Sequence, residues 1–155
     1  MTSAARQQRG PRLALSVQYA FRATQLPPQK ELRRWASAAL VQDAAVTLRI
    51  VGEAEGRRLN REFRGKDYAT NVLTFAYPEQ QPLAGDIVLC APVVRQEAHA
   101  QGVDLAAHYA HLIVHGILHL QGYDHERAAA AQIMESLESE IVTQLGYADP
   151  YAVQV

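Results

Sequence analysis

Residues 105–120 constrain the fold most, because an apolar run of helical length carries three histidines spaced four residues apart. This spacing places side chains on one face of an α-helix, so His111, His115 and His119 are predicted to line a single stripe. Gly122 follows, and a glycine in the left-handed region ends a helix and turns the chain. The segment therefore predicts a strongly apolar helix with one polar face, which ends near residue 121.

His125 completes the spacing His-x3-His-x2-Gly-x2-His with His115 and His119. A helix rises about 1.5 Å per residue, so His111 and His119 lie roughly 12 Å apart and cannot both reach one zinc ion. Two adjacent histidines can, and a turn at Gly122 allows His125 to join them. Three neutral imidazoles leave a fourth position open for water, as a catalytic zinc requires. We therefore predict one zinc ion per chain, held by His115, His119 and His125.

Metzincin proteases use this spacing for their zinc ligands, but one position argues against a peptidase. Zincin peptidases carry a glutamate directly after the first histidine as general base, and Gly116 stands there in this chain. The chain thus has the predicted metal ligands of these proteases but lacks their general base. The alternative is that these histidines lie on a helix surface or in the core without a metal. His111 is either a proton shuttle or a buried, hydrogen-bonded core residue.

Composition and charge narrow the classes of protein further. The chain has 155 residues, of which 48% are hydrophobic and 20% charged, as in ordinary globular domains. No run approaches the roughly 18 apolar residues of a membrane-spanning helix, so we expect no membrane association. Of 15 lysines and arginines, 13 lie in residues 1–70. These basic side chains form either an anion-binding face or a set of scattered, solvated charges. Cys90 is the only cysteine, so an intramolecular disulfide is excluded and a reducing compartment is favoured. We predict that Cys90 is a core residue.

Local patterns predict a single α+β domain with one small, mixed four-stranded sheet and about five helices. We expect a flexible arm at residues 1–10, the domain at residues 11–150 and a tail at residues 151–155. The predicted strands are residues 13–19, 45–51, 72–76 and 85–91. The predicted helices are residues 31–40, 53–63, 92–101, 105–120 and 126–145, and the last has an apolar stripe at Ile133, Leu137, Ile141 and Leu145.

Two motifs resemble those of the YbeY family. Residues 115–125 closely match its signature H-G-x-L-H-L-x-G-Y-D-H. Residues 64–75 resemble R-G-K-D-x-x-T-N-V-L-S-F, with threonine in place of serine at position 74. Residues 85–87 and 145–147 also fit, so the resemblance runs from about residue 45 to residue 150 in the order of the family.

The resemblance implies a zincin-like fold and a zinc-dependent, single-strand-specific endoribonuclease of the cytoplasm. Its expected role is 16S rRNA 3′-end maturation and ribosome quality control. The partners would be single-stranded rRNA and the ribosome, with ribosomal proteins or other ribonucleases as further candidates. His115 would be both a ligand and catalytic. Rival hypotheses are a peptidase-like zinc hydrolase and a non-catalytic ribosome-associated factor with a structural zinc.

The second motif supplies candidate substrate contacts. Arg64 matches the functional arginine of the family, and a guanidinium can bind two phosphate oxygens as charge develops in the transition state. Lys66 would add a point charge. Asn71 either binds substrate or braces the turn before the third strand. Asp86 and Asp124 are candidates to orient a ligand histidine, although Asp124 is equally suited to cap the last helix.

Overall fold

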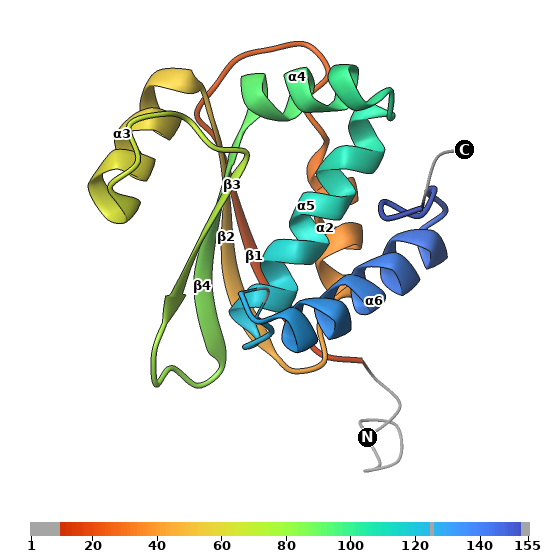
Figure 1. The fold of residues 1–155 in the computed structure, drawn as a ribbon. Coiled ribbons are helices and arrows are strands. Elements are labelled where there is room, and N and C mark those ends of the chain that lie inside the picture. The colour runs from red at the N-terminus through yellow and green to blue at the C-terminus, as the bar shows by residue number, and fades with distance from the viewer. Residues whose placement is uncertain (1–9, 125, 153–155) are drawn as a thin grey trace.

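The computed structural model describes residues 10–124 and 126–152 and contains one four-stranded sheet with helices on both faces (Figure 1). The strands are β1 (Leu13–Tyr19), β2 (Ala44–Val51), β3 (Val72–Tyr77) and β4 (Leu83–Cys90). The helices are α2 (Gln29–Ala38), α3 (Glu53–Arg64), α4 (Ala91–Gln101), α5 (Leu105–Leu120) and α6 (Ala128–Gln144). The strand order is β1-β2-β4-β3, in which β3 is antiparallel to β4 and the other pairs are parallel. The predicted α+β class with a small mixed sheet is confirmed.

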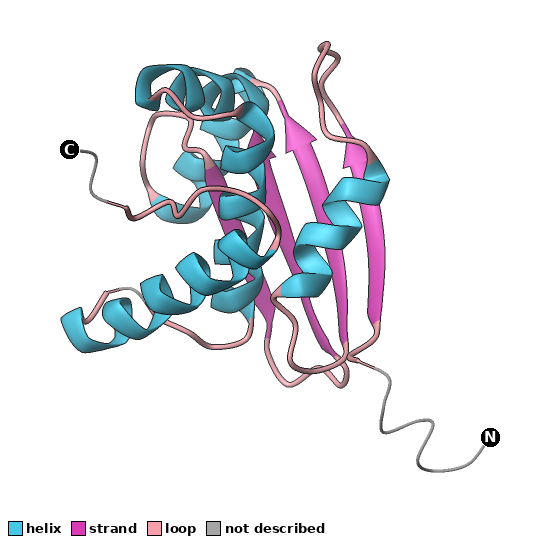
Figure 2. Cartoon of the chain, turned by 90° about the vertical axis from the view of Figure 1, so that its right-hand side faces the viewer, coloured by secondary structure: helices cyan, strands magenta, loops and turns pink. Residues whose placement is uncertain are grey.

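The helices form unequal layers on the two faces of the sheet. Figure 1 shows α2 and α5 against one face, with α6 outside α5, and α3 on the opposite face. Figure 2, turned by 90°, looks onto the thicker helical layer in front of the strands. No helix in the described ranges is long and apolar enough to cross a membrane.

Alternation along the strands divides the core into these two sides. Val46, Leu48 and Ile50 of β2 are buried under α2 and α5 in the main cluster. Cys90 belongs to a smaller cluster on the α3 side and is 1% exposed, which confirms the predicted core position. Side chains of successive strand residues point to opposite faces, so one strand serves both clusters.

Helix α5 lies at the centre of the thick layer and comes unusually close to the sheet. Ten of its sixteen residues are buried, as its apolar sequence predicts. Gly116 allows the close approach, since a Cβ there would lie 3.0 Å from Cδ1 of Ile87 and 3.3 Å from Cγ2 of Thr74. The position that carries a base in zincin peptidases therefore faces the sheet.

The last helix differs from its prediction at its start and in its buried face. Helix α6 begins at Ala128, because the turn before it is held by a hydrogen bond from the Glu126 N–H to Oδ1 of Asp124, at 2.8 Å. Ile133 was expected in the apolar stripe but is 60% exposed. The residues of α6 that are buried are Met134, Glu138 and Val142. Leu137, Ile141 and Leu145 of the predicted stripe are partly buried against the core, as expected. The most deeply buried positions lie one residue further along the helix, with a carboxylate at their centre.

Candidate metal centre

The polar stripe of α5 faces α6 and the segment after α5. His111 and His115 are 19% and 24% exposed, and His119 is an exposed residue in the last turn. Gly122 has φ of 101° and ends the helix as predicted. The turn is closed by the Tyr123 N–H, which donates to the carbonyl oxygen of Leu118 at 3.2 Å.

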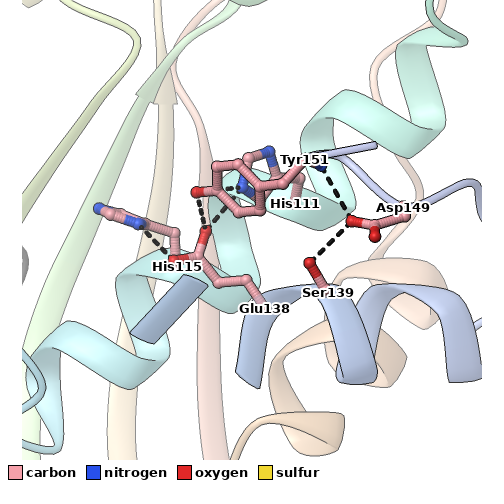
Figure 3. Close-up of polar contacts among 6 residues, drawn as sticks. All are labelled: His111, His115, Glu138, Ser139, Asp149 and Tyr151. Atoms are coloured by element: carbon pink, nitrogen blue, oxygen red, sulfur yellow. Dashed lines mark hydrogen bonds and ion pairs between the residues drawn. The ribbon is translucent and has the colours of Figure 1, made fainter. Parts of the chain in front are cut away.

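Glu138 of α6 lies at the centre of a buried polar cluster and contacts His111, His115 and Tyr151 (Figure 3). Its side chain is 1% exposed and one oxygen, Oε1, lies 2.6 Å from Nε2 of His111 and 2.8 Å from the hydroxyl of Tyr151. The other oxygen, Oε2, lies 3.3 Å from Nδ1 of His115. The cluster thus joins α5, α6 and the turn at residues 149–152, which we call the C-terminal turn.

The charge of Glu138 is maintained by its donors. Burial acts to raise the pKa of this carboxyl, but hydrogen bonds from His111, His115 and Tyr151 outweigh it and lower the pKa to about 2. Burial and the neighbouring Glu138 charge raise the pKa of Tyr151, which keeps its hydroxyl a donor. An ionised carboxylate only accepts hydrogen bonds, so each facing nitrogen must carry a proton.

The hydrogen-bond acceptors beside two histidines of the predicted triad favour the tautomer that a metal ligand needs. Glu138 is an acceptor, so Nδ1 of His115 is the nitrogen that carries a proton, and in the neutral ring the lone pair would then be on Nε2. Nδ1 of His119 lies 3.2 Å from the carbonyl oxygen of Tyr123, which selects the same tautomer. Ligand histidines usually donate their second nitrogen to a carboxylate or carbonyl in this way.

The third predicted ligand, His125, lies outside the described residues. Over residues 10–124 and 126–152, no group of three His, Cys, Asp or Glu side chains is arranged to hold a metal ion. The donor chemistry of His115 and His119 nevertheless fits a divalent ion that prefers imidazole. The complete triad remains a prediction.

Helix α3, which ends at Arg64, lies on the opposite face of the sheet from α5, and Lys66 follows two residues later (Figure 1). Arg64 is the last residue of α3, and both side chains are exposed. The preceding residue, Phe63, packs edge-on against Phe75 of β3 with ring centroids 5.2 Å apart. Thr74, the neighbour of Phe75, faces Gly116 on the α5 side. The end of α3 and helix α5 therefore flank the same stretch of the edge strand from opposite faces.

Asn71 has structural contacts at the start of β3. Its side-chain oxygen accepts the Val72 N–H at 2.6 Å, and its amide donates to Glu97 at 3.0 Å. Glu97 also lies 2.9 Å from Nε2 of His108, which is 7% exposed. These contacts favour the bracing role over substrate binding.

The two aspartates expected to orient a ligand have other partners. Asp86 accepts a hydrogen bond from the hydroxyl of Tyr77. It pairs with Phe75 across the sheet and faces away from α5, because the α5 side is taken by the adjacent Ile87–Thr74 pair. The expectation for Asp86 is therefore wrong. Asp124 holds the turn before α6, which starts at Ala128 after Arg127 as N-cap.

Comparison with known proteins identifies the family of this chain. The family model of endoribonuclease YbeY matches residues 20–146. This chain belongs to the YbeY family. The relative named Endoribonuclease YbeY from Methylobacillus flagellatus is 61% identical over 142 residues, which cover 92% of this chain and 95% of the relative. That from Nitrosomonas europaea is 60% identical over 142 residues, which cover 92% and 87%. The resemblance read from the two motifs is confirmed, and with it an enzyme class of RNA-cleaving hydrolases.

A solved structure agrees with the YbeY fold at lower similarity. The solution structure of TM1509 from Thermotoga maritima aligns with a TM-score of 0.56 at 24% identity, covering 90% of this chain and 99% of that chain. At this identity the match supports the fold alone. It agrees with the α+β architecture described above.

Glu138 is the residue of the buried polar cluster that the sequence did not lead us to expect. The available signal was its spacing, because Met134, Glu138 and Val142 recur every four residues in a helix that must bury one face. A glutamate within such a stripe is almost never fully buried unless it is paired. Its position therefore pointed to donors on a neighbouring helix.

Proposed function

We propose that this chain is a zinc-dependent, single-strand-specific endoribonuclease of the cytoplasm. Its role would be 16S rRNA 3′-end maturation and ribosome quality control. Membership of the YbeY family supports RNA as the substrate. The observation that carries the proposal is the pair His115 and His119, one helical turn apart, each with Nδ1 facing an oxygen acceptor. This is the arrangement that a metal-binding pair on one helix requires.

The proposed ligands are His115, His119 and His125, with one zinc ion per chain. Three imidazoles favour zinc, although copper and nickel also bind such sites. When bound, the ion would activate a water molecule or polarise a phosphate oxygen. The protein contributes the orientation of the ligand rings, which the acceptors of Nδ1 restrict.

Arg64 is the proposed catalytic partner across the edge strand. A guanidinium can donate to two phosphate oxygens, and such donors matter most where negative charge develops during cleavage. Lys66 would place a second positive charge next to the RNA backbone. Asn71 is the weakest of the proposed substrate contacts, since its side chain already bonds Val72 and Glu97.

The surface beside Arg64 also suits a single strand of RNA. Phe63 and Tyr68 are 60% and 58% exposed and lie within two residues of Arg64 and Lys66 in the sequence. Unpaired bases stack on aromatic rings whereas bases within a duplex are already stacked. We propose that the strand crosses β3 from this surface toward the histidines. The ribosome, its proteins and other ribonucleases are the proposed wider partners.

The environment of Gly116 disfavours the peptidase alternative. A side chain at this position would meet Ile87 and Thr74 of the sheet, so a general base has no room there. A peptidase would need its base from another element. Casein hydrolysis that a chelator abolishes would revive this alternative.

The proposal is tested by metal content and RNA cleavage on the same samples. We expect about one zinc per wild-type chain and cleavage of single-stranded rRNA but not of duplex RNA. His115→Ala should remove both metal and cleavage, whereas Arg64→Ala should remove cleavage alone. Cleavage by zinc-free His115→Ala would refute the catalytic metal site. Unfolding of wild type on chelation would instead favour a structural zinc in a ribosome-associated factor.

A further inference from the structure

We propose that Glu138 is a positioning residue for the metal centre, and that the C-terminal turn acts on the centre through it. The inference rests on the proposed metal site and goes beyond it, because it assigns a function to residues outside both sequence motifs. Glu138 lies on α6, and Tyr151 lies near the end of the described chain. Neither residue is proposed to touch metal or RNA.

The carboxylate of Glu138 is held in one orientation. His111 and Tyr151 bond the same oxygen, Oε1, from α5 and from the C-terminal turn. With Oε1 held from two directions, Oε2 is directed at Nδ1 of His115 (Figure 3). A buried charge needs such partners, so rotation of this 1% exposed carboxylate away from His115 would cost hydrogen bonds.

Tyr151 is itself anchored to α6 beside Glu138. Oδ1 of Asp149 accepts a hydrogen bond from the Ser139 hydroxyl at 2.7 Å and from the Tyr151 N–H at 2.9 Å. The Tyr151 ring also packs edge-on against His111, with centroids 5.3 Å apart. The contacts thus form a continuous connection from Ser139 through Asp149, Tyr151 and Glu138 to His115.

This connection has a defined chemical effect on the metal centre. A carboxylate that accepts the Nδ1–H of a ligand histidine fixes its tautomer, holds the ring and raises the basicity of Nε2. Loss of such a partner typically lowers metal affinity about 10- to 100-fold. Glutamine at position 138 keeps the shape of the side chain, but it is neutral and one of its two oxygens is replaced by an amide that donates.

The test measures zinc affinity by competition with a chromophoric chelator. We expect Glu138→Gln to weaken zinc binding about 10- to 100-fold and Tyr151→Phe to weaken it by a smaller factor. Glu140→Gln, an exposed glutamate of the same helix, is the matched control and should bind zinc as wild type does. A folded Glu138→Gln with affinity within about twofold of wild type would overturn the inference.

A second measurement needs neither metal nor activity. Nitrogen-15 NMR of the imidazoles in metal-free wild type should find the His115 proton on Nδ1, and Tyr151→Phe should shift this resonance. If Glu138→Gln fails to fold, Tyr151→Phe decides, and unchanged zinc affinity together with an unchanged His115 resonance would overturn the inference. RNA cleavage on the same samples separates the two proposals, since absent cleavage contradicts the proposed function while the affinity difference still stands.

Discussion

Nδ1 of His115 lies 3.3 Å from a carboxylate oxygen of Glu138, whose side chain is 1% exposed. The contact joins the signature helix α5 to a residue of α6 that no motif contains. It explains how a buried negative charge is tolerated in this core, because three donors surround it. It also makes the orientation of His115 depend on the packing of α6.

Removal of a proposed ligand should eliminate metal binding without unfolding the domain. His119→Ala changes an exposed side chain whose Nδ1 lies 3.2 Å from the Tyr123 carbonyl oxygen, so the metal-free protein should lose about 1 kcal/mol of unfolding free energy and stay folded. Elemental analysis should find the zinc lost. His99→Ala, which changes an exposed histidine of α4, is the control and should keep the metal. Full zinc content in His119→Ala would contradict the ligand assignment.

Arg64→Ala should slow RNA cleavage about 100-fold or more, because one positioned donor to a developing charge contributes that much. Zinc content should not change, since Arg64 lies at the end of α3 across β3 from the histidines. Arg58→Ala removes another exposed arginine of α3 and should have little effect on the rate. Equal rates for the two variants would remove Arg64 from the proposed mechanism.

Tyr68→Ala should weaken binding of single-stranded RNA by about 1–3 kcal/mol if a base stacks on this ring. The side chain is 58% exposed, so little stability should be lost. Fluorescence anisotropy with a labelled oligonucleotide measures the affinity. Val41→Ala, which shortens a side chain that is 71% exposed, serves as the control. Unchanged affinity in Tyr68→Ala would show that RNA takes another path.

Gly116→Glu should destabilise the fold by about 3 kcal/mol and should not create a peptidase. The new side chain would be forced against Ile87 and Thr74, and its carboxylate would be buried without a donor. Urea denaturation measures the loss. Ala106→Glu, at an exposed position of the same helix, should stay within about 0.5 kcal/mol of wild type. A stable Gly116→Glu that hydrolyses casein would contradict the packing argument.

The ion pair between Arg49 and Glu55 should make stability depend on acid pH. The guanidinium donates two hydrogen bonds, at 2.7 and 3.0 Å, and these lower the pKa of the Glu55 carboxyl below its ordinary value of 4.5. At pH values between the folded and unfolded pKa of Glu55, this carboxyl is protonated more often in the unfolded chain than in the folded one. The ion pair therefore stabilises the fold above about pH 4.5, and this stabilisation is lost as the pH falls below that value. Urea denaturation should therefore find wild type more stable than Glu55→Gln at pH 7, with a smaller difference at about pH 3. A difference independent of pH would refute the ion pair as its cause.

The order of elements could be predicted from local patterns. Alternation of Val46, Leu48 and Ile50 predicts a strand with one buried face, and the apolar run of residues 105–120 predicts the central helix. These signals survive in the fold because each is set by neighbours in the sequence and by the demand to bury apolar surface. The end of α5 could be predicted in the same way from Gly122, since glycine readily adopts the positive φ observed there.

The sequence by itself determined the histidine spacing on α5, the turn after it and the arginine motif at the end of α3. The tertiary structure decided which side chains surround these residues. Glu138 reaches His115 because α6 packs on α5 with Met134, Glu138 and Val142 as its most deeply buried residues. Asp86 is excluded because its strand position faces the other side of the sheet. Spacing along a chain specifies the face of one element. The partner of that face depends on the angle and register at which separate elements pack, and these are set by the whole core.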